Sequence, residues 1–264
     1  MNKIHLISFG APFEKYKNAH KRFYNSAKCF NSFNSINIFS EKNIYNFCKD
    51  IRQHKNILST TKGYGYWIWK YYLILEMMNK VEENDIIFYS DLGCTLNKYG
   101  TKRFNEYIIK TKKFGALTFQ LGHEEFKYTK IDTYKRVFGD SFAHFSTPQI
   151  LAGAFFFINN KFNKSIMKEM INIGIENNFY SISDKPSTIP DHKNFIEHRH
   201  DQSLFSLIAK KHNLAYLDDE TFFENWYSDG IEFPIWATRN RNGLEKSELF
   251  AYYYNKFFNI IRKK

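Results

Sequence analysis

Short apolar runs alternate with longer polar segments along the chain, and this alternation is typical of α/β proteins. The apolar runs predict strands at Lys3–Phe9, Ile36–Ser40, Asp85–Ser90, Ala116–Leu121 and Gly153–Ile158. Between them, the spacing of apolar residues predicts helices over Phe13–Lys28, Ile44–His54, Tyr66–Lys80, Thr101–Lys112, Lys161–Asn177 and Asp201–Lys211. We therefore expect an α/β domain.

The run Asp85–Ser90 is continuously apolar after its first residue rather than alternating. Such a run suits a strand that is buried on both faces of a parallel sheet. It ends in Asp91-Leu92-Gly93, at the carboxyl end of the predicted strand, which is where open α/β sheets bind their ligands. The alternative is that Asp91 only forms a turn.

Composition narrows the class of protein. The chain has 264 residues, of which 43% are hydrophobic and 19% aromatic, and this excludes a disordered chain. Its 38 Lys and Arg exceed its 27 Asp and Glu, which gives a net charge of +11. A positive field attracts polyanions, anionic membranes or phosphate-bearing small molecules, and the composition does not choose among them.

Three cysteines, Cys29, Cys48 and Cys94, form no CxxC pair, which favours a reduced, cytoplasmic protein. The longest apolar run, Ile150–Ile158, is about half the length of a membrane span, so we expect no transmembrane helix.

The first candidate ligand-binding segment is KGYGYWIWK, residues 62–70. Its two glycines permit a tight turn before a helix. A flat base can stack on the rings of Tyr64 or Trp67, and the ammonium groups of Lys62 or Lys70 can meet a phosphate. The alternative is an aromatic-rich helix start that packs in the core.

A second segment, EHRHDQS at residues 197–203, gathers polar side chains at a predicted helix start. Asp201 can act as a base or stabilise positive charge on a sugar, and the alternative is that it only caps the helix. The HExxH pattern of zinc proteases is absent from the sequence. The preceding segment, Ser181–His200, contains Pro and Ser and predicts a loop that could act as a flap.

Two basic segments follow. Arg239 and Arg241 in FPIWATRNR face the same way if the segment is extended, and paired arginines suit phosphate oxygens. The alternative is an exposed basic loop. Near the C-terminus, apolar residues recur at helical spacing among lysines and arginines, which predicts a basic amphipathic helix over 245–264. Such a helix can lie on an anionic membrane or pack on its own domain.

Five segments in order, GYGYWIWK, DIIFYSDLGC, TPQILAG, HRHDQSLFS and FPIWATRNR, resemble bacterial GT-A-type glycosyltransferases from capsule and lipopolysaccharide gene clusters. The resemblance spans residues 62–241. It implies a GT-A-like (Rossmann-like) fold with a mixed, mostly parallel sheet flanked by helices over residues 1–244, followed by the helix 245–264.

The resemblance also implies roles for individual residues. Donor binding falls to Lys62, Tyr64, Trp67, Lys70, Asp91, Gly93, Arg239 and Arg241. The catalytic pair is Asp201 and Gln202. The acceptor or sugar pocket is formed by Gln149, Gly153, His198 and His200. A divalent cation, Mn²⁺ or Mg²⁺, would bind at Asp91, but Gly93 stands where the second acid of a D-x-D motif would be, which leaves metal dependence open.

The function implied is hexosyltransferase-like transfer from a nucleoside diphosphate sugar to a capsule, lipopolysaccharide or lipooligosaccharide acceptor. The acceptor would be attached to a lipid carrier or to lipid A core, at the inner face of the cytoplasmic membrane. Two alternatives stay open. One is a basic nucleic-acid-binding protein, against which no RRM, KH or helix-turn-helix signature appears. The other is a non-catalytic, membrane-associated scaffold with a degenerate GT-A fold.

Overall fold

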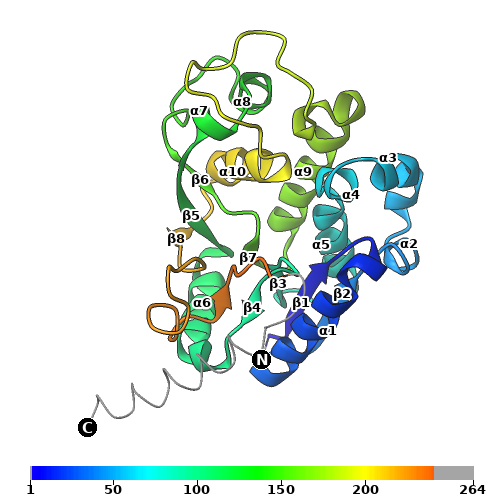
Figure 1. Ribbon diagram of the computed structural model, residues 1–264, viewed down its shortest axis with the longest axis vertical. Coiled ribbons are helices and arrows are strands. Elements are labelled where there is room, and N and C mark those ends of the chain that lie inside the picture. The colour runs from blue at the N-terminus through cyan, green and yellow to red at the C-terminus, as the bar shows by residue number, and fades with distance from the viewer. Residues whose placement is uncertain (1, 241–264) are drawn as a thin grey trace.

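The computed structural model describes residues 2–240, and a seven-stranded sheet lies at its centre (Figure 1). The strands are β1 (Ile4–Phe9), β2 (Ser35–Phe39), β3 (Ile86–Ser90), β5 (Ala116–Glu124), β6 (Pro148–Ile150), β7 (Ala154–Ile158) and β8 (Tyr216–Asp218). Their order is β2-β1-β3-β7-β5-β6, and β8 pairs with β5. The pairings make β6 and β7 run against the other five strands, so the predicted mixed, mostly parallel sheet is confirmed.

Helices cover both faces of this sheet. The longer ones are α1 (Phe13–Phe30), α5 (Trp69–Lys80), α6 (Thr101–Phe114), α8 (Ile131–Phe138), α9 (Lys161–Phe179) and α10 (Asp201–Lys211). The short ones are α2 (Ile44–Phe47), η1 (Asp50–His54), α3 (Lys55–Thr60), α4 (Gly63–Tyr66), η2 (Lys98–Gly100), α7 (Glu125–Tyr128) and η3 (Tyr180–Ile182). A separate two-stranded sheet joins β4 (Thr95–Leu96) to β9 (Ile235–Trp236).

Strand β3 explains why its sequence is continuously apolar. Ile86 and Phe88 belong to the core that contains residues of α1 and α6, whereas Ile87 and Tyr89 belong to the core that contains residues of α5, α9 and α10. Both faces of the strand are therefore buried, as the run of apolar residues predicted. Because the strand itself is buried, a polar residue can reach solvent after its carboxyl end but not within the strand.

Two predicted helices differ from the structure. The predicted helix Ile44–His54 is broken, because Cys48 is extended (φ −118°, ψ 105°) between α2 and η1. Helix α5 begins at Trp69 rather than at the predicted Tyr66. Two of the residues lost from its start, Tyr66 and Trp67, belong to a left-handed turn.

Residues 63–67 form a left-handed turn, with φ between +50° and +90° at every position from Gly63 to Trp67. Three of these residues carry side chains, and each costs about 1–2 kcal/mol in this conformation. The turn is held by a hydrogen bond from the Tyr66 N–H to the Lys62 carbonyl (2.8 Å) and by another from Trp69 Nε1 to the Gly63 carbonyl (3.0 Å). Strain of this kind concentrates at functional sites.

The predicted domain boundary at residue 244 and the predicted helix 245–264 lie outside the described residues. Within residues 2–240, no helix combines the length and the apolar character that a membrane span requires.

We expect Gly65→Ala to lower the free energy of unfolding by at least about 2 kcal/mol, measured by denaturant titration. Gly65 has φ +90°, and an added Cβ would lie 2.2 Å from Leu58 Cδ2. The control is Gly122→Ala, because an added Cβ at Gly122 meets nothing within 4 Å. Equal stability of the two variants would contradict the account of the turn.

Candidate active site

Asp91 follows β3 directly, and solvent reaches it at the carboxyl edge of the sheet. Its side chain is 48% exposed, and its N–H donates to the Gly153 carbonyl at 2.8 Å, just before β7. The Tyr89 hydroxyl donates to Asp91 Oδ1 at 2.6 Å. A Cβ at Gly153 would lie 3.1 Å from Asp91 Oδ2, so the glycine allows the backbone to pass close beneath the carboxylate.

Lys70, the second residue of α5, joins Asp91 to a second acid. Its side-chain nitrogen lies 2.7 Å from Asp201 Oδ2, 2.7 Å from the Ala152 carbonyl and 3.9 Å from Asp91 Oδ1. The residue is only 2% exposed. The ammonium group therefore neutralises a buried carboxylate and lies beside a half-exposed one.

Asp201 is the first residue of α10 and is buried. It accepts hydrogen bonds from the Lys70 ammonium and from the Tyr71 hydroxyl (3.2 Å). Burial, reinforced by the nearby carboxylates, raises the pKa of Tyr71 and of Tyr89 well above the usual range, so both hydroxyls remain donors. Asp201 is thus an anchor for Lys70 and not an acid open to solvent.

The environment of Asp91 has opposing effects on its charge. The surrounding protein atoms raise the pKa of the Asp91 carboxyl above its ordinary value, while the Lys70 ammonium and the Tyr89 hydroxyl lower it. The Asp201 carboxylate also raises the pKa of Asp91, and the Arg239 guanidinium lowers it. Arg239 is therefore close enough to Asp91 to interact with it electrostatically.

The loop after Asp91 is held from α1. Arg22 Nη2 donates to the carbonyls of Leu92 (2.7 Å) and Asn240 (2.9 Å), and Nη1 donates to the carbonyl of Cys94 (2.8 Å). One guanidinium thus joins the strand-end loop to the segment that ends the described chain.

Gly93 meets the same segment. Its carbonyl accepts from the Asn240 N–H and from the Thr238 hydroxyl, both at 3.0 Å. An added Cβ at Gly93 would lie 3.3 Å from Arg239 Cα, and the Arg239 side chain is exposed. The predicted donor residues Asp91, Gly93 and Arg239 therefore lie together, whereas Arg241 lies outside the described residues.

The left-handed turn contacts the start of α10. The His200 ring stacks on the Tyr66 ring, with centroids 5.4 Å apart and planes at 24°, and lies 5.4 Å from the Trp67 ring. His200 itself has φ +54°. Its Nδ1 lies 2.9 Å from the Ile182 carbonyl, which fixes the proton on that nitrogen. Two strained segments therefore support each other beside Lys70 and Asp201.

Two further predicted donor residues, Lys62 and Tyr64, lie in or directly before the left-handed turn. Lys62 is exposed, with its nitrogen 3.9 Å from Asp184 Oδ1, and the same oxygen lies 3.5 Å from His200 Nε2. The Tyr64 hydroxyl is within 2.8 Å of the Tyr45 hydroxyl, and the Tyr64 ring lies 5.7 Å from that of Phe9.

Three of the four predicted pocket residues are buried: His200, described above, His198 and Gln149. His198 accepts from the Lys130 N–H (3.3 Å) and lies 3.0 Å from the Ser181 carbonyl, and burial lowers its pKa well below the ordinary value, which keeps the ring neutral. Gln149 is fully buried and accepts from Gln202 Nε2 at 3.0 Å. His198 and Gln149 both support the start of α10, and Gln202 is the partly exposed member of this group.

The predicted loop Ser181–His200 is held against α8 (Figure 1). The buried Lys130 donates to the carbonyls of Tyr180, Ser183 and Lys185, and burial lowers its pKa to about 8. Asp132 and Asp191 of the same region accept backbone N–H bonds from Thr188 and Ile131. These contacts fix the backbone that leads to His200 and Asp201, so this loop is anchored and is not a free flap.

The described residues do not fit a divalent-cation centre. Among residues 2–240, no group of three or more His, Cys, Asp or Glu side chains is placed to hold a metal ion. Gly93 supplies no side-chain oxygen, Asp91 Oδ1 already accepts from Tyr89, and the Lys70 ammonium lies 3.9 Å from that oxygen.

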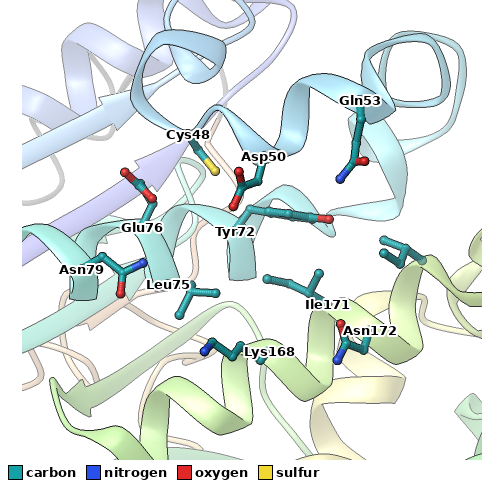
Figure 2. Close-up of a pocket in the computed structure, with 11 residues that line it drawn as sticks. Cys48, Asp50, Gln53, Tyr72, Leu75, Glu76, Asn79, Lys168, Ile171 and Asn172 are labelled. Carbon is teal, nitrogen blue, oxygen red and sulfur yellow. The ribbon is translucent and has the colours of Figure 1, made fainter.

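A separate hollow of about 330 Å³ lies between α5, α9 and the segment around η1 (Figure 2). Figure 2 shows Asp50 on one wall and Lys168 on the other. The walls carry both signs of charge, and the predicted site residues are not among those that line it. The hollow therefore does not coincide with the cluster around Asp91.

Sequence reasoning missed three residues of the cluster: Tyr71, Tyr89 and Arg22. Tyr89 could have been predicted from the sequence, because residues i and i+2 of an extended chain share a face. This rule places the side chain of Tyr89 beside that of Asp91. The bonds of Tyr71 to Asp201 and of Arg22 to Asn240 join positions 130 and 218 residues apart. No local pattern in the sequence marks such pairs.

No protein-family model matches the chain, and no curated protein matches its sequence. Among solved structures, a glycosyltransferase involved in glycosylation of the major capsid of PBCV-1 aligns with a TM-score of 0.51 and 14% identity, over 93% of this chain and 96% of that one. Mouse xyloside xylosyltransferase 1 aligns at 0.47 and 10% identity, over 92% and 99% of the two chains. The galactosyltransferase LgtC aligns at 0.43 and 9% identity, over 91% and 84%. The alignment at a TM-score of 0.51, together with the mixed sheet, makes the fold of this chain GT-A-like, as its sequence segments predicted.

The Lys70–Asp201 pair gives a stability prediction. We expect Lys70→Met to lower the free energy of unfolding by about 3–5 kcal/mol, because it leaves Asp201 buried without its counter-ion. In the double variant with Asp201→Asn, the loss should be smaller than the sum of the single losses by at least about 1 kcal/mol.

The control cycle uses the more exposed pair Lys80–Glu76, whose nitrogen and oxygen lie 3.0 Å apart. Its coupling should be about 0.5 kcal/mol or less. Denaturant titration of both sets measures these values. Additive losses at Lys70 and Asp201 would show that the pair does not stabilise the fold.

Proposed function

We propose that the protein is a glycosyltransferase that moves a sugar from a nucleoside diphosphate sugar to a glycan acceptor. A GT-A-like fold alone does not establish an activity. The observation that carries the proposal is the half-exposed Asp91 at the carboxyl edge of the sheet, linked through the buried Lys70 to Asp201 at the start of α10. Open α/β sheets bind ligands at this edge.

In this proposal, the exposed residues at the edge bind the donor. Asp91 accepts hydrogen bonds from hydroxyl groups of the ribose or of the transferred sugar. The side chains of the left-handed turn, Tyr64 and Trp67, offer apolar surface to the nucleotide, and Lys62 is exposed beside them. Arg239, and Arg241 beyond the described residues, offer guanidinium groups to the diphosphate.

The buried residues act by positioning. Asp201 fixes the ammonium of Lys70 beneath Asp91, and His200 fixes the turn that carries the aromatic rings. The two residues of the proposed catalytic pair therefore have different roles, because Asp201 is buried and its neighbour Gln202 is partly exposed. We assign Gln202, rather than Asp201, to direct contact with the sugar. Gly153 keeps the backbone close to Asp91.

Chemically, the acceptor hydroxyl oxygen forms a bond to the anomeric carbon of the donor sugar. The bond from that carbon to the phosphate oxygen breaks, and its electron pair leaves with the nucleoside diphosphate. The proton of the acceptor hydroxyl is released. Fixed positive groups stabilise the charge that develops on the leaving diphosphate without reorganising, which is the largest contribution in many enzymes.

For the acceptor, we propose a surface glycan of the capsule or lipopolysaccharide type, built on a lipid carrier or lipid A core at a membrane. Two observations support this. The chain has a net charge of +11, and its last residues combine lysines and arginines with apolar and aromatic residues. An anionic membrane surface attracts such a segment.

The activity is tested first with a panel of UDP-, GDP-, CMP- and dTDP-sugars, by measuring nucleotide release and product formation. With the active donor, we expect Asp91→Asn to lower kcat/KM at least about 100-fold, because the charged acceptor of donor hydroxyls is lost. The melting temperature should change little, since the side chain is 48% exposed.

The matched control is Asp140→Asn, at a carboxylate with 95% of its side chain exposed. It should retain wild-type turnover. Wild-type turnover by Asp91→Asn would remove Asp91 from the site. A panel without turnover, together with salt-sensitive binding of oligonucleotides, would favour a nucleic-acid-binding protein. A panel without donor hydrolysis or oligonucleotide binding would favour a scaffold.

The membrane proposal has its own test. Deleting residues 245–264 removes five basic residues and two acidic ones. We expect the truncated chain to lose most of its co-sedimentation with phosphatidylglycerol vesicles and to keep its melting temperature. Phosphatidylcholine vesicles should bind the full chain weakly. Unchanged sedimentation of the truncated chain would exclude these residues as the membrane contact.

A further inference from the structure

We propose that the diphosphate of the donor binds without a divalent cation, and that three cationic side chains of this chain, Arg239, Lys70 and Arg22, supply the positive charge instead. The inference rests on the proposed function. Its basis is the chemistry of the groups around Asp91, where carboxylates are few and fixed cations are several.

The backbone of another segment occupies the space where a second acid would project. An added Cβ at Gly93 would lie 3.3 Å from Arg239 Cα, which is tighter than ordinary contact. The Gly93 carbonyl is itself occupied by the Asn240 N–H and the Thr238 hydroxyl. A side chain at this position would require the backbone at Arg239 to shift by a few tenths of an ångström.

Lys70 further disfavours a metal ion at Asp91. Its ammonium lies 3.9 Å from Asp91 Oδ1 and is held there by Asp201 and by the Ala152 carbonyl. A divalent ion bound to Asp91 would be repelled by this ammonium, because like charges a few ångströms apart repel each other strongly near a protein surface. The ammonium of Lys70 thus supplies beside Asp91 the positive charge that a bound metal ion would otherwise supply.

Arg22 adds a second fixed charge on the other side of the loop. Its guanidinium donates to three backbone carbonyls and to the Thr95 hydroxyl (2.9 Å), and within residues 2–240 no carboxylate forms an ion pair with it. Its Nε is buried without a hydrogen-bond partner. Its positive charge therefore lies against the loop Leu92–Cys94 without a directly paired acid among the described residues.

Arg239 is the cation that can contact the ligand. Its side chain is exposed, its backbone is held at φ +52°, and its guanidinium interacts electrostatically with Asp91. Guanidinium groups bind phosphate oxygens with two parallel hydrogen bonds. Lys70 and Arg239 therefore lie near the carboxylates of Asp91 and Asp201, and Arg22 lies against the loop that follows Asp91. These three cations exceed the two carboxylates by one positive charge, which favours binding of an anion.

The experiment measures binding, not turnover. Isothermal titration with UDP, GDP, CDP and dTDP is run in EDTA and again with Mn²⁺ or Mg²⁺. We expect at least one nucleotide to bind in EDTA, with a dissociation constant within about threefold of that measured with the metal. Electron paramagnetic resonance of Mn²⁺ mixed with the protein and this nucleotide should show no bound ion beyond that of the nucleotide alone.

Variants then test the source of the charge. Arg239→Gln should weaken binding of the nucleoside diphosphate at least tenfold and that of the corresponding nucleoside less than threefold. The matched control is Lys28→Gln, which removes an exposed cation from the last turn of α1. It should leave both affinities unchanged.

Three results would overturn the inference. One is nucleotide binding that requires Mn²⁺ or Mg²⁺, or that strengthens more than about threefold with it. Another is a protein-bound Mn²⁺ signal that disappears in Asp91→Asn. The third is an unchanged affinity in Arg239→Gln. If no nucleotide binds in any condition, the proposed function is contradicted and the inference fails with it. If a nucleotide binds only with the metal ion, the inference fails and the proposed function stands.

Discussion

The buried ammonium of Lys70 is the group on which the site depends. It connects α5 to the start of α10, 131 residues further along the chain, and it lies beside the half-exposed Asp91 at the end of β3. A buried charge is tolerated only when it is paired and hydrogen-bonded. Lys70 meets this condition through Asp201 and the Ala152 carbonyl, so the positions of three elements are fixed together.

Much of the surrounding structure keeps this pair in place. The left-handed turn before α5 sets where the helix begins, and His200 packs against it from the other segment. Lys130 binds the carbonyls of the loop that leads to His200. The strained backbone at the turn and at His200 is therefore supported by packing between two segments that are distant in sequence. Rigid support of this kind holds a site in one geometry.

The comparison with solved glycosyltransferases and the geometry of the site contribute different things. The shared fold identifies the carboxyl edge of the sheet, which is where open α/β sheets in general bind ligands. The groups around Asp91 belong to this chain: the half-exposed acid itself, a glycine two residues after it, and the cations Lys70, Arg239 and Arg22. Because one fold supports many chemistries, the proposed activity depends on these groups and not on the likeness.

The sequence by itself determined the local structure. The alternation of apolar and polar residues located β1, β3, β7, α1, α6 and α10 to within a few residues, because periodicity is a property of neighbouring positions. It also placed Asp91 at a strand end, and its segments GYGYWIWK and HRHDQS marked the chain regions that meet. Only the tertiary structure decided how they meet. The sequence left Asp201 either to act on the sugar or only to cap the helix, and the structure adds its buried contacts with Lys70 and Tyr71. Gly93 was interpreted as a missing acid, yet the backbone of Arg239 occupies its surroundings. Contacts between residues more than 100 positions apart depend on chain packing and leave no periodic signal, so the partners and burial of these charges were not readable from the sequence.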